Sequence, residues 1–171
     1  MFPGASGGFA STQPNVVTTP VAVTNTVTET ALYTFAVPPG TLGTTNRLRL
    51  TLWGNVVAGV GPPTLTFRAK YGSAVVVVAN ALVTLLSQTG QWCLTVDLMG
   101  TGGTATQLIA AELQGHITTA IATVAEETFR VWATAAIDST VAQNLVITVQ
   151  AGSVVATTTV NMQGASLEYV R

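Results

Sequence analysis

The chain has 171 residues, of which 48% are hydrophobic and only 8% are charged, and its formal net charge is −1. This length suits one domain with a substantial core. The charge balance lacks the basic surface that nucleic-acid binding requires. The longest apolar run, residues 74–86, is shorter than the roughly 20 residues of a membrane helix. We therefore expect no nucleic-acid partner and no membrane partner.

The low charge also bears on self-association. Typical soluble domains contain about 25% charged residues, and charges normally protect exposed strand edges from pairing with other chains. One interpretation is a thermally robust, Thr-rich β-protein. The composition favours another, in which much of the surface is covered by copies of the chain or by a scaffold.

Residues 1–22 are rich in Gly, Pro, Ser and Thr and show no strand or helix period. The segment is predicted to be an extended N-terminal arm, with Phe2 and Phe9 as its large anchors. A free tail and an arm that docks on a neighbour are equally compatible with this composition. The segment has no basic start and no apolar stretch, so we do not expect a signal peptide.

Strand patterns begin after the arm. Residues 26–37 are β-branched and aromatic, and Pro38-Pro39-Gly40 ends them. Residues 47–53 alternate, with three leucines on one face and two arginines on the other, which is typical of a half-buried strand. This face of leucines requires a second sheet to cover it.

Two hairpins are predicted next. Residues 64–71 alternate, and Gly72-Ser73 predicts a tight turn into residues 74–80, whose four consecutive valines favour a strand covered on both faces. Residues 81–89 fit a loop or one helical turn. Residues 91–99 and 104–114 form the second hairpin, with Trp92 inward on the first strand and Leu108 and Ala110 inward on the second.

Residues 115–127 could form a helix, but their Thr and Ile content favours a strand or loop. Further strands are predicted over residues 128–136, 141–150 and 154–170. The total is eight to ten strands with no clear helix. We therefore predict an all-β fold over residues 23–171, an antiparallel β-sandwich of the jelly-roll type with about eight strands.

Residues that carry chemistry are few. His116 has no Cys, Asp or His at metal-ligand spacing, and Cys93 has no neighbour that would lower the pKa of its thiol. Glu126 and Glu127 would point to opposite faces of a strand and so cannot work as a pair. We expect no catalytic residues, no cofactor, no metal and no enzymatic activity.

The tryptophans are the more informative residues. Trp92 is in phase with the inward residues of its strand and is expected in the core. Trp53 and Trp132 are out of phase with the apolar faces of their strands, which predicts exposure unless the register is shifted by one residue. An exposed Trp could stack on a sugar ring or pack in a subunit interface, and the low charge favours the interface.

One long segment points to a family. The run TETALYTFAVPPGTLGTTNRLRLTLWGN at residues 28–55 resembles a pattern that recurs in tailed-phage virion proteins, where TET and an aromatic strand ending in Pro are followed by LGT and then LRL. TLTFRAKYG at 64–72 and DSTVAQNLVITVQ at 138–150 are similar to segments of the same proteins. The resemblance covers residues 25–80 and 135–170 and leaves out the arm and residues 81–127.

The resemblance implies a jelly-roll subunit, usually oligomeric, on the outside of a virion that assembles in the host cytoplasm. Such subunits serve as capsid decoration (cement) proteins, head fibres or tail components, and no catalytic motif comes with them. Our first hypothesis is a decoration subunit that forms a homotrimer and docks on the major capsid protein through residues 1–22. The alternative is a tail or fibre-tip module that binds host glycan through Trp53 or Trp132. A polysaccharide depolymerase is disfavoured, because the seven acidic residues are scattered along the chain.

Overall fold

The computed structural model describes residues 12–24, 26–59, 61, 63–83, 89–119, 123–154 and 158–170. These residues form eleven β-strands and no helix. The strands are β1 (Thr12–Val17), β2 (Val21–Thr24), β3 (Thr30–Val37), β4 (Arg47–Val57), β5 (Thr64–Tyr71), β6 (Ala74–Val83), β7 (Thr89–Gly103), β8 (Thr106–Thr119), β9 (Thr123–Ala135), β10 (Gln143–Ala151) and β11 (Thr159–Val170). In this described part of the chain no helix is long and apolar enough to span a membrane.

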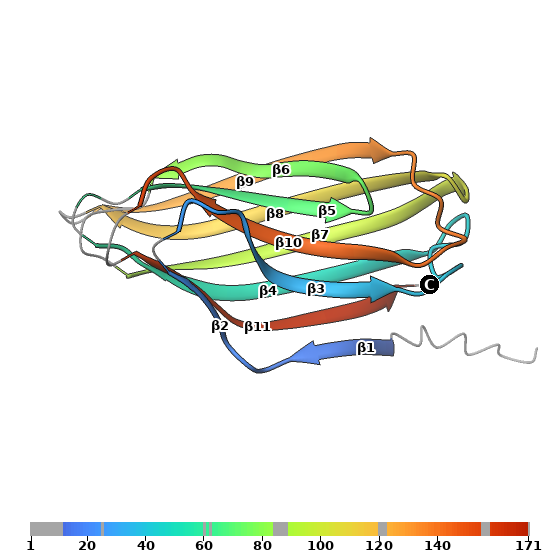
Figure 1. The fold of residues 1–171 in the computed structure, drawn as a ribbon, viewed down its shortest axis with the longest axis horizontal. Helices are drawn as coiled ribbons and strands as arrows, with labels where there is room; N and C mark the ends of the chain where they lie inside the picture. Colours follow the sequence, from blue (N-terminus) through green and yellow to red (C-terminus); the bar gives the residue numbers. More distant parts are fainter. Residues whose placement is uncertain are drawn as a thin grey trace, which may run out of the picture.

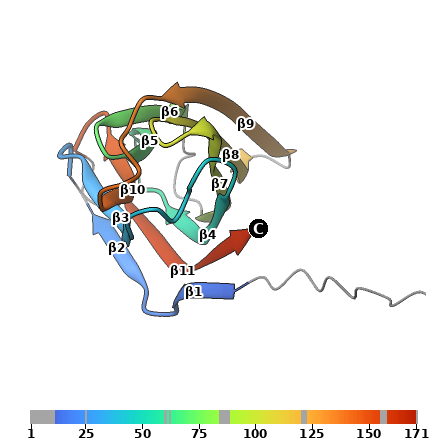
Figure 2. The ribbon, with the colours of Figure 1, turned by 90° about the vertical axis from the view of Figure 1, so that its right-hand side faces the viewer.

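The strands form two antiparallel sheets that pack face to face (Figures 1 and 2). The large sheet has the order β1-β11-β4-β7-β8-β9, with β2 also paired to β11, and the small sheet has the order β3-β10-β5-β6. Without β1, β8 and β9, eight strands remain. In the large sheet they have the order β2-β11-β4-β7, and in the small sheet the order β3-β10-β5-β6. If these eight strands are renumbered 1 to 8 along the chain, the two orders become 1-8-3-6 and 2-7-4-5, which is the connectivity of a jelly roll. The predicted fold class is therefore confirmed. The β8–β9 hairpin widens the large sheet beyond these eight strands.

The core lies between the inner faces of the two sheets. Leu48, Leu50 and Leu52 of β4 are at most 1% exposed, as their alternation predicts. The rings of Phe67 and Trp92 join the two sheets, with their centroids 5.5 Å apart. Because the inner positions of both sheets are almost all apolar, their burial supplies the main force that holds the sandwich together.

Two predicted strand environments were wrong. In β8 the inward residues are Ile109, Ala111 and Leu113, whereas Leu108 and Ala110 lie on the outer face. In β6, Val75 and Val77 are 50% and 44% exposed, while the valines that follow each of them are buried. Both strands carry apolar residues in both phases, so alternation alone could not show which face is inside.

The N-terminal segment also differs from its prediction. Residues 12–17 and 21–22, which were predicted to belong to the arm, lie in β1 and β2, and both strands pair with the C-terminal strand β11. Pro14 is tolerated there because β1 is an edge strand of the large sheet. Phe2 and Phe9 lie outside the described residues, and their docking role stays a prediction.

Several strands are longer than the alternation suggested. β4 continues to Val57 and β7 to Gly103. Residues 100–103, which separate the two predicted strands of the second hairpin, therefore all belong to β7, and the turn is at residues 104 and 105. The uncertain segment 115–127 is divided between β8, which runs to Thr119, and β9, which begins at Thr123. The strand at residues 64–71 and the turn at Gly72-Ser73 are as predicted. The second strand of this hairpin, β6, runs to Val83 instead of ending at residue 80.

Candidate functional site

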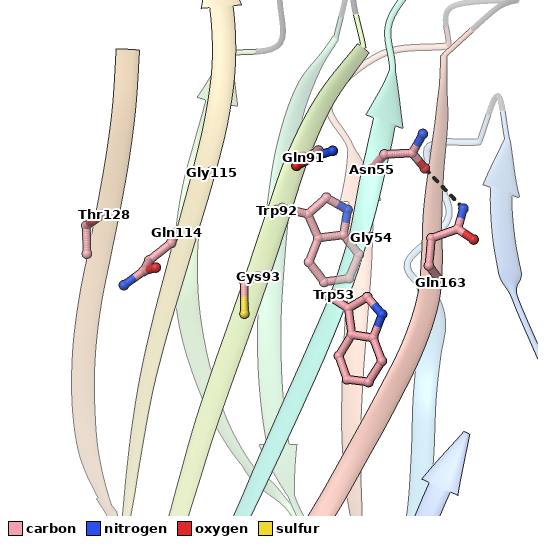
Figure 3. Close-up of a pocket in the computed structure, with 10 residues that line it drawn as sticks. All are labelled: Trp53, Gly54, Asn55, Gln91, Trp92, Cys93, Gln114, Gly115, Thr128 and Gln163. Carbon is pink, nitrogen blue, oxygen red and sulfur yellow. Dashed lines mark hydrogen bonds between the residues drawn. The ribbon is translucent and has the colours of Figure 1, made fainter. Parts of the chain in front are cut away.

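The outer face of the large sheet has a hollow of about 660 Å³ (Figure 3). It crosses the strands from β11 to β9, and one row of directly paired residues runs through it: Trp53 of β4, Cys93 of β7, Gln114 of β8 and Thr128 of β9. The other lining residues are Gly54, Asn55, Gln91, Trp92, Gly115 and Gln163. None of the ten lining residues carries a charge.

Trp53 forms an aromatic platform beside the hollow. Its ring lies over Gly164 of β11, because a Cβ atom at that glycine would come within 2.5 Å of Cζ2 and 2.8 Å of Cε2 of the indole. A β-bulge between Met162 and Gly164 sets the glycine opposite Trp53. An aromatic ring packed over a cross-strand glycine is held flat against the sheet. Trp53 remains 43% exposed and can therefore contact a ligand.

Amide side chains line the hollow beside this platform. Asn55, Gln91, Gln114 and Gln163 all line the hollow. Gln163 Nε2 donates to Asn55 Oδ1 over 3.4 Å, as Figure 3 shows, and Gln114 Nε2 donates to Glu112 Oε1 over 2.6 Å. Each amide offers both donor and acceptor atoms. The arrangement is suited to an uncharged ligand with many hydroxyl groups and at least one apolar face.

Cys93 lies in the row of Trp53 and is only partly exposed. Burial and, to a smaller extent, the charge of Glu112 raise the pKa of its thiol. A thiol with a raised pKa is a poor nucleophile at neutral pH. Among the side chains that the structure describes, no group of three or more His, Cys, Asp or Glu residues could hold a metal ion. The side chains of His116, Glu126 and Glu127 lie outside the described residues.

Ion pairs occupy the same outer face beyond the hollow. Asp97 pairs with Arg47 at 2.5 Å and with Arg49 at 3.0 Å, and Arg130 pairs with Glu112 at 2.8 Å. Burial of the Asp97 carboxylate opposes its ionisation, but hydrogen bonds from both arginines outweigh burial and lower its pKa. The two arginines of β4 therefore lie on the outer face, as the alternation of residues 47–53 predicts.

The other two tryptophans have different surroundings. Trp92 is 4% exposed and packs in the core, whereas Trp132 on β9 is 73% exposed. Trp132 lies on the same outer face as Trp53, four positions beyond Thr128 on β9. Sequence reasoning therefore found the two exposed rings but missed Gly164 and the four amides. Only the strand pairing brings those residues to Trp53, and no local motif marks them.

Comparisons with known proteins found no matching family model and no curated protein that matches. Among solved structures, peanut lectin with a nine-residue peptide has a TM-score of 0.44 and 9% identity, and the match covers 98% of this chain and 94% of the lectin. The CBM2 module of the evolved Dit protein of Lactobacillus casei BL23 phage J-1 has a TM-score of 0.32 and 12% identity, and the match covers 88% of this chain and 75% of the module. A structure of infectious bursal disease virus, Gt strain, has a TM-score of 0.29 and 10% identity, and the match covers 94% of this chain and 41% of the viral chain. Identities of 12% or less and TM-scores of 0.44 or less carry no function over to this chain.

Proposed function

We propose that this protein is a non-enzymatic β-sandwich subunit of a phage virion that binds a neutral saccharide on the outer face of its large sheet. The observation that supports the binding role is the platform itself: the Trp53 ring lies over Gly164 beside a hollow that is lined by uncharged amides. The virion setting is supported by the sequence resemblance at residues 28–55, 64–72 and 138–150.

A saccharide suits this site better than the other common ligand classes. The face of a pyranose ring carries C–H bonds, which the negative face of an indole attracts, while its hydroxyl groups need donors and acceptors of the amide type. A nucleic acid would need positive charge along the hollow, and among the side chains that the structure describes none that lines it is charged. An anionic ligand is disfavoured for the same reason.

The test is binding of the full chain to an array of neutral and acidic glycans, with Trp53→Ala as the variant. We expect wild-type protein to bind neutral glycans, and the variant to keep its circular dichroism spectrum but lose binding. Thr34→Ala, which shortens an exposed side chain on β3 of the opposite sheet, is the matched control and should bind normally. Wild-type protein that binds no glycan, or a Trp53→Ala variant that binds fully, would contradict the proposal.

A second candidate is the capsid decoration subunit, a homotrimer bound to the major capsid protein. It is supported by the exposed valines of β6, which give the small sheet an apolar outer patch that another copy could cover. The chain needs a segment that reaches the shell, and residues 1–11 precede the first strand of the sandwich. The two roles are compatible, since the saccharide site lies on the other sheet.

Deleting residues 1–11 tests this second role. Because β1 and β2 are retained, the shortened protein should unfold at the same temperature as the full chain. We expect it to be absent from particles that incorporate the full chain. Normal incorporation of the shortened protein would refute the docking role, and a monomer in sedimentation experiments would refute the trimer.

A further inference from the structure

We propose that the saccharide is an extended chain and that Trp132 is a second stacking subsite, which only longer oligosaccharides reach. This inference rests on the proposed function of the Trp53 site. It adds the direction in which the ligand lies, its minimum length and one further contact residue.

The direction follows from the hollow. Its lining begins at Gln163 on β11 and ends at Thr128 on β9, so a ligand that fills it lies across the strands. At the β9 end, the exposed side chains on the outer face continue along the strand through Arg130 to Trp132. A chain that turns along β9 at this end passes Arg130 and then reaches Trp132.

The length follows from the register. Trp53 and Trp132 lie three strands apart, because the row from Trp53 reaches Thr128 on β9, and Trp132 is four residues further along. With strands about 4.8 Å apart and a rise of about 3.3 Å per residue, the offsets are about 14 Å across and about 13 Å along, or about 19 Å between the two Cα atoms. One or two sugar rings cannot bridge this separation, whereas an oligosaccharide of several units can.

The surroundings of Trp132 favour a ligand contact. Its direct neighbour on β8 is Ala110, whose small side chain leaves the indole uncovered on that side. Arg130, next to it on the same face, has a side chain that is 70% exposed and is paired with Glu112. The pair leaves little net charge on the path, which suits the same neutral ligand.

The experiment measures affinity as a function of chain length by isothermal titration calorimetry. The probes are cello-oligosaccharides and chito-oligosaccharides from the dimer to the hexamer, whose neutral rings present apolar faces to indole. The variants are Trp132→Ala, Trp53→Ala and the control Thr34→Ala. We expect the dimer to bind wild type and Trp132→Ala equally. We expect the hexamer to bind wild type roughly ten-fold more tightly than it binds Trp132→Ala, the change that one stacking contact of about 1.4 kcal/mol gives.

The outcomes separate the two proposals. Loss of binding at every length in Trp53→Ala, with hexamer binding unchanged in Trp132→Ala, overturns the second subsite and leaves the proposed function standing. Full binding by Trp53→Ala, or no binding of either series to wild type, overturns both for this ligand class. If Trp132→Ala instead changes the oligomeric state in sedimentation experiments and keeps wild-type affinity for the hexamer, Trp132 is a contact between copies, and the inference is wrong.

Discussion

Gly164→Ala is a sharp test of the platform, because it moves Trp53 without altering any polar group of the hollow. The new methyl group would lie 2.5 and 2.8 Å from two ring atoms and 3.1 Å from the carbonyl oxygen of Val17. Ordinary carbon contacts are about 3.5–4.0 Å, so the ring must lift by about 1 Å. Overpacking in a closed core costs about 1–3 kcal/mol. Here the cost should be near 1 kcal/mol, because an exposed ring can move into solvent.

The effect on binding should exceed this modest effect on stability. A tilted ring no longer presents a flat face, and we expect roughly ten-fold weaker saccharide binding, the equivalent of about 1.4 kcal/mol. Calorimetry gives the binding loss, and chemical denaturation gives the free energy of unfolding. In a Trp53→Ala background, Gly164→Ala should cause no further loss of binding. Wild-type affinity in the single variant, or an equal loss in both backgrounds, would refute the reasoning.

Three further predictions address the scaffold and the thiol. Phe67→Ala removes a fully buried ring and should lower the free energy of unfolding by about 3–5 kcal/mol, while Phe35→Ala, at a partly buried position, should cost less by the same measurement. Asp97 has a lowered pKa in the folded protein, so the stability it contributes is present above its unfolded pKa of about 3.9 and is lost as the pH falls through its lower folded pKa. Asp97→Asn should therefore be less stable at neutral pH and lose less stability on acidification, and equal acid sensitivity in both proteins would show that the arginine pairing is unimportant. Cys93 should react with iodoacetamide at pH 7 more slowly than free cysteine, because its pKa is raised, and a bulky maleimide attached to it should block saccharide binding, as calorimetry can show.

The parts of the fold that could be predicted are those where one phase of a strand is apolar and the other polar. The strand at residues 64–71 has the predicted bounds, and the three leucines of β4 point inward as expected. The two arginines of β4 that alternate with them were correctly placed outside, where both pair with Asp97. In these strands the sequence determines which face is buried, because a register shift of one residue would bury the charged side chains.

In other strands, the choice of the buried face depends on contacts with segments that are distant in the sequence. β8 has apolar residues in both phases, and its buried polar residue, Gln107, is satisfied by the carbonyl of Thr104 and the amide of Ile137. The four valines of β6 predict a strand that is covered on both faces, but β6 is an edge strand of the small sheet. For the same reason, only part of the candidate site could be predicted from the sequence. Trp53 could be predicted to point outward, but Gly164 lies more than a hundred residues away and reaches it only through the pairing of β4 with β11.

The binding claim is tested most directly by residue-resolved nuclear magnetic resonance of the three indole N–H groups. Addition of a short saccharide that binds on the array should shift the signal of Trp53 and leave that of Trp92, which is buried in the core, nearly unchanged. That result would place the sugar on the platform over Gly164. If the saccharide binds and the Trp53 signal does not move, the ligand lies elsewhere, and the outer face of the large sheet is not the binding site.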